Sequence, residues 1–142
     1  MTTTGGPRLS SVIALVLGTL SVSACGGSAD PDAIPAVPAA GTVTYQGKPL
    51  ETGEIQFLPD KGRTATGTIE KGAFTMNTYG DGDGAIPGTH KVTVYSVKEV
   101  RLKGGDSEAK YITPEKYASP DSSGLTLEIP SDGKTDIVID LK

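Results

Sequence analysis

Residues 125–141 read LTLEIPSDGKTDIVIDL, with apolar side chains at every second position before and after a central turn. Such alternation is typical of a β-strand with one buried face, because successive side chains of a strand point to opposite sides of the sheet. The turn at 130–134 contains proline, aspartate and glycine, which favour tight turns through their backbone and hydrogen-bonding properties. The stretch predicts two strands that bury Leu125, Leu127, Ile129, Ile137, Ile139 and Leu141.

The same period continues toward the N-terminus. It predicts strands over 42–46, 53–58, 63–70 and from 90 to about 97, and a short hairpin at 70–72 that leads into a further strand. The buried faces of these strands are expected to carry Val43, Tyr45, Ile55, Phe57, Ala65, Gly67, Ile69, Phe74, Met76, Val92 and Val94. No window shows a sustained helical period. About seven short strands with turns between them predict an all-β protein with a single Ig-like β-sandwich and Greek-key-like connections.

The long segment 98–122 interrupts this pattern. It contains Gly104-Gly105, Pro114 and Pro120, and a loop of this length in a compact domain is usually functional or mobile. Residues 114–117 are expected to form one helical turn that starts at proline.

Charges of both signs alternate in the first half of that segment. The basic residues Lys98, Arg101 and Lys103 are interspersed with Glu99, Asp106 and Glu108. We interpret them as a solvated loop.

The N-terminus has the three parts of an export signal: a polar start with Arg8 as its one charge, an apolar run over 12–20, and small residues before Cys25, the single cysteine. Glycine, threonine and serine interrupt the run before it reaches the roughly 20 apolar residues that a transmembrane helix needs. We expect a processing segment rather than a membrane-spanning helix.

Residues 22–25, Val-Ser-Ala-Cys, resemble the lipobox of bacterial lipoproteins. The resemblance implies cleavage between Ala24 and Cys25, a diacylglyceryl thioether on the Cys25 sulfur, and a further acyl chain such as palmitate on the new N-terminus. Two or more acyl chains anchor a protein stably, since each buried methylene contributes about 0.8 kcal/mol. An ordinary secretory signal followed by a free thiol is the alternative.

The expected organisation is a signal peptide over 1–24, a flexible tether over 25–40, and one domain over 41–142. The tether is rich in glycine, proline and alanine and lacks a period, so it cannot bury enough apolar surface to fold. The chain carries 13 basic and 17 acidic residues, a net charge of −4. Without a basic cluster it lacks the electrostatic attraction on which nucleic-acid binding depends.

Several segments of the domain resemble one family. Residues 41–50 (GTVTYQGKPL) and 53–59 (GEIQFLP), together with 65–76 and 86–94, resemble the carboxypeptidase regulatory-like, transthyretin-like domain. Residues 114–127 look like the end of small bacterial lipoproteins built on this domain. The resemblance implies a transthyretin-like β-sandwich and no chemistry of its own, because in carboxypeptidases the domain lies beside the catalytic unit.

Catalytic residues are scarce. His90 is the one histidine, too few for a zinc peptidase. It lies in a strand pattern, and no nucleophile elbow that would serve a Ser-His-Asp hydrolase accompanies it. We expect a structural His90, no enzyme activity and no cofactor.

Other binding chemistries find little support. Asp81 and Asp83, spaced two apart in a glycine-rich turn, could offer oxygen ligands to calcium. A complete calcium loop adds further ligands at set spacings, whereas aspartate and glycine are common in turns for backbone reasons alone. We predict no metal site. Asn77, the one asparagine, makes an isopeptide bond improbable, and the loop tyrosines Tyr79, Tyr111 and Tyr117 offer few platforms for carbohydrate.

Together these features predict a lipid-anchored cell-envelope protein, a non-catalytic structural or binding module that faces the periplasm or the exterior. The resemblance to bacterial lipoproteins implies a sorting rule in which an aspartate after the cysteine favours inner-membrane retention. Gly26 stands at that position, so the outer membrane is preferred in a cell that has one. The alternative is an accessory subunit that recognises an envelope protein or ligand through the 98–122 loop. The ligand-binding residues are not identified by the sequence.

Overall fold

The computed structural model describes residues 2–3, 5–6 and 33–142, and in this part of the chain the protein is all-β. Most of the expected signal peptide, its cleavage site at Ala24 and Cys25, and the first half of the expected tether lie outside the described residues. The elements are β1 (Ala39–Tyr45), β2 (Lys48–Pro49), β3 (Thr52–Pro59), β4 (Ala65–Glu70), β5 (Ala73–Thr75), β6 (Gly88–Tyr95), β7 (Val97–Arg101), β8 (Ser107–Tyr111), the 3₁₀ helix η1 (Glu115–Ala118), β9 (Leu125–Ile129) and β10 (Lys134–Leu141).

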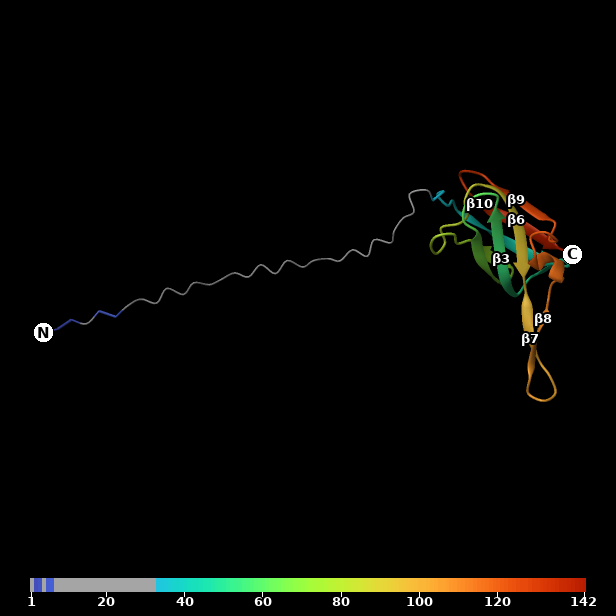
Figure 1. The fold of residues 1–142 in the computed structure, drawn as a ribbon, viewed down its shortest axis with the longest axis horizontal. Coiled ribbons are helices and arrows are strands. Elements are labelled where there is room, and N and C mark those ends of the chain that lie inside the picture. Colours follow the sequence, from blue (N-terminus) through green and yellow to red (C-terminus); the bar gives the residue numbers. More distant parts are fainter. Residues whose placement is uncertain (1, 4, 7–32) are drawn as a thin grey trace. The chain divides into compact units, whose positions relative to one another are not determined.

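Eight of these strands form one curled sheet that packs on itself as a β-sandwich (Figure 1). The strand order is β10-β1-β5-β4-β3-β6-β9, and β2 extends the pairing of β1. All neighbours are antiparallel except β1 and β10, which run parallel with Val43 opposite Ile139. The two strands of 125–141 do not pair with each other, because β9 lies beside β6 and β10 beside β1.

The alternating pattern identifies the core correctly. Most of the predicted inward side chains are at most 8 % exposed, among them Val43, Ile55, Phe57, Ile69, Met76, Val94 and Leu141. Phe57 and Phe74 meet edge to face, with ring centroids 5.9 Å apart. Tyr45, Leu125 and Leu127 are only partly buried and pack against the rim of the core. Full burial of one large apolar side chain contributes roughly 1.5–3 kcal/mol to stability, so the buried side chains of the core are the main source of the stability of the domain.

The predicted hairpin at 70–72 is confirmed. Glu70 pairs with Ala73, and Lys71 and Gly72 between them have φ angles of 52° and 81°. Two successive positive φ angles are those of a tight two-residue turn whose twist matches the flanking strands.

The folded domain begins before the expected boundary at Gly41. Strand β1 starts at Ala39, which is buried, and Val37 exchanges two backbone hydrogen bonds with Ala85 at 2.8 and 3.0 Å. The last residues of the expected tether therefore belong to the domain. Glycine is required at position 41, because a Cβ there would lie 2.7 Å from the Cβ of Ile137 on the parallel strand β10.

The expected loop 98–122 is wrong in its first half, which is a β-hairpin. Strands β7 and β8 pair from Val97 opposite Tyr111 to Arg101 opposite Ser107. No helix in the described residues is long and apolar enough to cross a membrane.

Candidate functional site

The β7–β8 hairpin is a separate two-stranded sheet that projects from one end of the sandwich (Figure 1). Every residue from Arg101 to Tyr111 is exposed. Leu102, close to the tip, is 48 % exposed. An isolated two-stranded hairpin is at best marginally stable in water, so this element gains little order from burial.

The root of the hairpin is firmly attached. The backbone N–H of Ile112 donates to the carbonyl of Ser96 at 2.9 Å, and the hydroxyl of buried Ser96 donates to the carbonyl of Thr52 at 2.5 Å. The rings of Tyr95 and Tyr111 meet edge to face at 5.6 Å. The hairpin thus continues the strand direction of β6 away from the core.

The tip is closed by a glycine turn. Gly104 and Gly105 have φ angles of 132° and 96°, which residues with a side chain rarely adopt. The N–H of Leu102 donates to the carbonyl of Asp106 at 2.8 Å. The pair of glycines that suggested a loop in the sequence is therefore the turn of a hairpin.

Charge dominates the hairpin surface. Lys98 lies directly opposite Lys110 across the strands, and Glu108 lies opposite Val100. Neither lysine forms an ion pair within the described part of the chain, where the salt bridge present joins Lys91 to Asp121 at 3.5 Å. Like charges directly opposite each other destabilise a strand pair. The solvated interpretation of Lys98, Arg101 and Lys103 is confirmed by their exposure.

The second half of the segment, 112–122, packs onto the sandwich. The expected helical turn is present as η1, which begins at Glu115 directly after Pro114. Tyr117 is buried, and its hydroxyl donates to the carbonyl of Lys142 at 3.0 Å and accepts from the N–H of Lys142 at 3.1 Å. Tyr117 therefore holds the segment against the end of β10 and is not available for binding.

In the turn that contains Asp81 and Asp83, the carboxylate of Asp83 accepts hydrogen bonds from the backbone. The Asp83 carboxylate accepts hydrogen bonds from the N–H groups of Thr78 at 2.7 Å, Tyr79 at 2.8 Å and Gly80 at 3.0 Å. Partial burial acts to raise the pKa of Asp83, but these hydrogen bonds stabilise the ionised form and hold its pKa below the usual value. Asp81 is exposed.

Metal ligands do not gather around this turn. No three His, Cys, Asp or Glu residues of the described part of the chain are placed to hold a metal ion together. The same loop is tied down by Asn77, whose side-chain oxygen accepts from the N–H of Gly82 at 2.6 Å, and by Tyr79, whose hydroxyl donates to the carbonyl of Ile34 at 2.9 Å. The two aspartates thus lie in a turn that hydrogen bonds already order.

His90 is a core residue. Its side chain is fully buried, and Nε2 donates to the carbonyl of Ile86 at 2.7 Å. Nδ1 has no hydrogen-bond partner in the described part of the chain, and the ring lies 5.9 Å from that of Phe57. No substrate can reach this imidazole without opening the sandwich.

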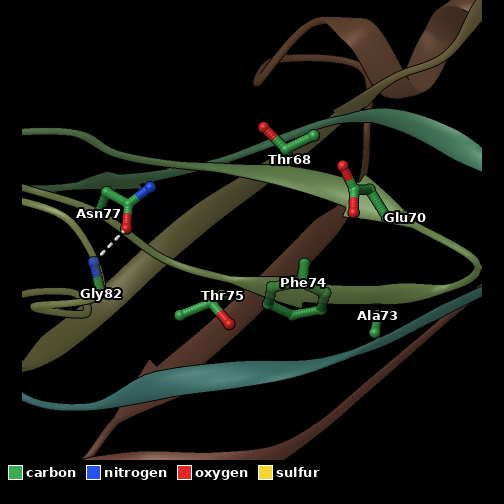
Figure 2. Close-up of a pocket in the computed structure, with 7 residues that line it drawn as sticks. All are labelled: Thr68, Glu70, Ala73, Phe74, Thr75, Asn77 and Gly82. Carbon is green, nitrogen blue, oxygen red and sulfur yellow. Dashed lines mark hydrogen bonds between the residues drawn. The ribbon is translucent and has the colours of Figure 1, made fainter.

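An open groove of about 450 Å³ runs beside β4 and β5 (Figure 2). It lies where their ladder loosens, because they pair at Ile69–Phe74 and Glu70–Ala73 and then only at the bridge from Thr66 to Asn77. The lining residues are Thr68, Glu70, Ala73, Phe74, Thr75, Asn77 and Gly82. Glu70 is the one charged group among them, so the groove lacks converging catalytic or metal-binding groups.

The hairpin is thus the element that sequence reasoning missed, although its residues had been singled out as a contact region. Comparison of the chain with protein-family models, curated proteins and solved structures gives no match.

Proposed function

We propose that this protein is a lipid-anchored, non-catalytic binding module of the cell envelope and that the β7–β8 hairpin is its contact element. The lipobox-like residues before Cys25 support the anchor, and the resemblance to the carboxypeptidase regulatory-like domain supports a non-catalytic sandwich. The buried position of His90 is consistent with a structural role for this residue.

The observation that carries the binding role is the exposure of the hairpin. Residues 98–111 contribute no side chain to the hydrophobic core, since all are exposed except half-buried Val100, and their strands pair only with each other. They nevertheless form a charged ladder of unbroken register on a root fixed by Ser96 and Ile112. Binding residues are often presented in this way, on a projecting element held by a rigid scaffold.

The anchor is tested by the intact mass of the membrane-fraction protein beside a Cys25→Ala variant. We expect a mass equal to residues 25–142 plus acyl groups, and an unprocessed variant. An unmodified soluble product cut at another site would contradict the anchor.

The contact role is tested by replacing residues 98–110 with a two-residue turn and comparing proteins captured from envelope extracts by intact and shortened chains. The matched control shortens the chain at the exposed turn residues Ser131 and Asp132. If both shortened chains capture the same proteins as the intact chain, the hairpin is not the contact element.

A further inference from the structure

Strand β8 has a free edge whose backbone groups point away from the molecule. Two hydrogen bonds fix this orientation: Ile112 N–H to Ser96 at one end of the hairpin, and Leu102 N–H to Asp106 at the other. The register is unbroken between them, so even-numbered residues form the hydrogen-bonded pairs. The N–H and C=O groups of Ser107, Ala109 and Tyr111 therefore face outward from β8.

The free edge is complementary to itself. If two copies of β8 run antiparallel with Ala109 opposite Ala109, the outward backbone groups of Ser107, Ala109 and Tyr111 meet in hydrogen-bonded pairs. Glu108 of each copy then lies opposite Lys110 of the other, in the non-hydrogen-bonded positions where side chains approach most closely.

Other registers are unfavourable. A shift of the centre by one residue toward Ser107 places Glu108 opposite Glu108, although Asp106, just outside β8, then lies opposite Lys110. A shift toward Tyr111 places Lys110 opposite Lys110. Within β8, only the register centred on Ala109 opposes unlike charges without a like-charge pair. Two copies of β7 could also pair through their free edges, with Glu99 of one copy opposite Arg101 of the other. These residues would lie in hydrogen-bonded pairs, where the Cα atoms are farther apart and the side chains are less close. Charge complementarity therefore selects β8 and the register centred on Ala109.

Pairing would also relieve a defect within each hairpin. Lys98 and Lys110 face each other without an ion pair in the described part of the chain. In the paired arrangement a carboxylate, Glu108 of the second copy, lies on the other side of Lys110. Two marginal two-stranded sheets become one four-stranded sheet, in which β8 of each copy has a hydrogen-bonded neighbour on both edges.

We propose that the partner of the hairpin is a second copy of this chain, bound through antiparallel β8–β8 pairing centred on Ala109. The inference rests on the proposed role of the hairpin as contact element but not on the anchor at Cys25. The contact is small, five residues of each copy, so the dimer is weak in dilute solution. Tethering to one surface would raise the local concentration and favour it.

The test is disulfide trapping in the full-length chain purified in detergent. In the proposed pair the two Ala109 Cα atoms lie about 5.5 Å apart, a distance that a disulfide can span. Ala109→Cys should give a covalent dimer on mild oxidation. The chain without substitutions controls for crosslinks through Cys25. Thr126→Cys, at an exposed position of the edge strand β9, controls for random collision.

Charge reversal then tests the register. Adding Lys110→Glu to Ala109→Cys opposes like charges at both positions and should lower the trapped fraction about tenfold. Adding Glu108→Lys as well exchanges the charges and should restore it. Trapping at Ala109 no greater than at Thr126, or no recovery in the exchanged variant, would overturn the proposal.

The outcomes separate this inference from the proposed function. A hairpin that captures a different envelope protein, with no trapping at Ala109, would preserve the binding role and overturn self-pairing. Trapping at Ala109 in a chain that proves to carry no lipid would support self-pairing and contradict the anchor. Because the hairpin is solvated, the thermal unfolding of the sandwich should be the same in every variant.

Discussion

Replacing Tyr117 with phenylalanine should destabilise the protein by about 1–3 kcal/mol, because the hydroxyl makes two hydrogen bonds to the backbone of Lys142, at 3.0 and 3.1 Å. The side chain is only 5 % exposed, and the ring itself is retained in the variant, so the loss falls on the polar contacts. Each hydrogen bond contributes about 1 kcal/mol net, and the partly buried N–H and C=O of Lys142 lose their partner.

Urea or thermal unfolding measures this loss. A change of 1 kcal/mol shifts the melting temperature of a domain of this size by about 4–8 °C. Tyr95→Phe is the matched control, because Tyr95 is 45 % exposed and its hydroxyl has no hydrogen-bond partner among the described residues. If Tyr117→Phe has the same melting temperature and unfolding free energy as Tyr95→Phe, the Tyr117 hydroxyl does not hold the 112–122 segment to the end of β10, and the reasoning is refuted.

Three further predictions concern the strand junction, the acidic turn and the hairpin. Gly41→Ala should lower the unfolding free energy by more than about 2 kcal/mol, because its methyl group would meet Ile137 of β10; the exposed neighbour Thr42→Ala should have little effect, and equal losses would refute the close approach. Asp83→Asn should lose stability near neutral pH relative to Asp81→Asn. Since the pKa of Asp83 is lower in the folded than in the unfolded state, its contribution is present above the unfolded pKa and disappears as the pH falls through the folded pKa; a difference that persists in acid would contradict this assignment. Replacing 98–110 by a short turn should leave the melting temperature within a few degrees of the intact chain, and a large drop would show that the hairpin supports the core.

The core could be predicted from the sequence because its signal is local. Alternation places Ile55 and Phe57, or Ile137 and Ile139, on one face regardless of which strand lies beside them. The parallel pairing of β1 with β10 could not be predicted in this way. It joins residues almost a hundred positions apart, and apolar alternation does not say which edges meet.

The β7–β8 hairpin was not predicted, because it lacks the local apolar signal that identifies the core strands. Neither face of β7 or β8 is buried in a core, so the strands leave no apolar period in the sequence. Their order comes from backbone pairing and from the turn at Gly104 and Gly105. The domain boundary was misplaced because a stretch rich in proline and alanine resembles a linker, whereas Val37 and Ala39 already pair with or pack against the sandwich.

The distribution of charge separates the two parts of the molecule. Seven charged residues lie between 98 and 110, on an element that contributes no side chain to the hydrophobic core. Substitutions there should have little effect on the stability of the sandwich, whereas β1 and β10 tolerate few changes because their backbones approach closely at Gly41. A two-stranded ladder is marginally stable by itself, so a partner that adds a strand would order the hairpin as it binds. The free-energy cost of this ordering would lower the net binding affinity. In the proposed pair of identical hairpins this ordering cost arises in both copies, which is a further reason to expect a weak dimer.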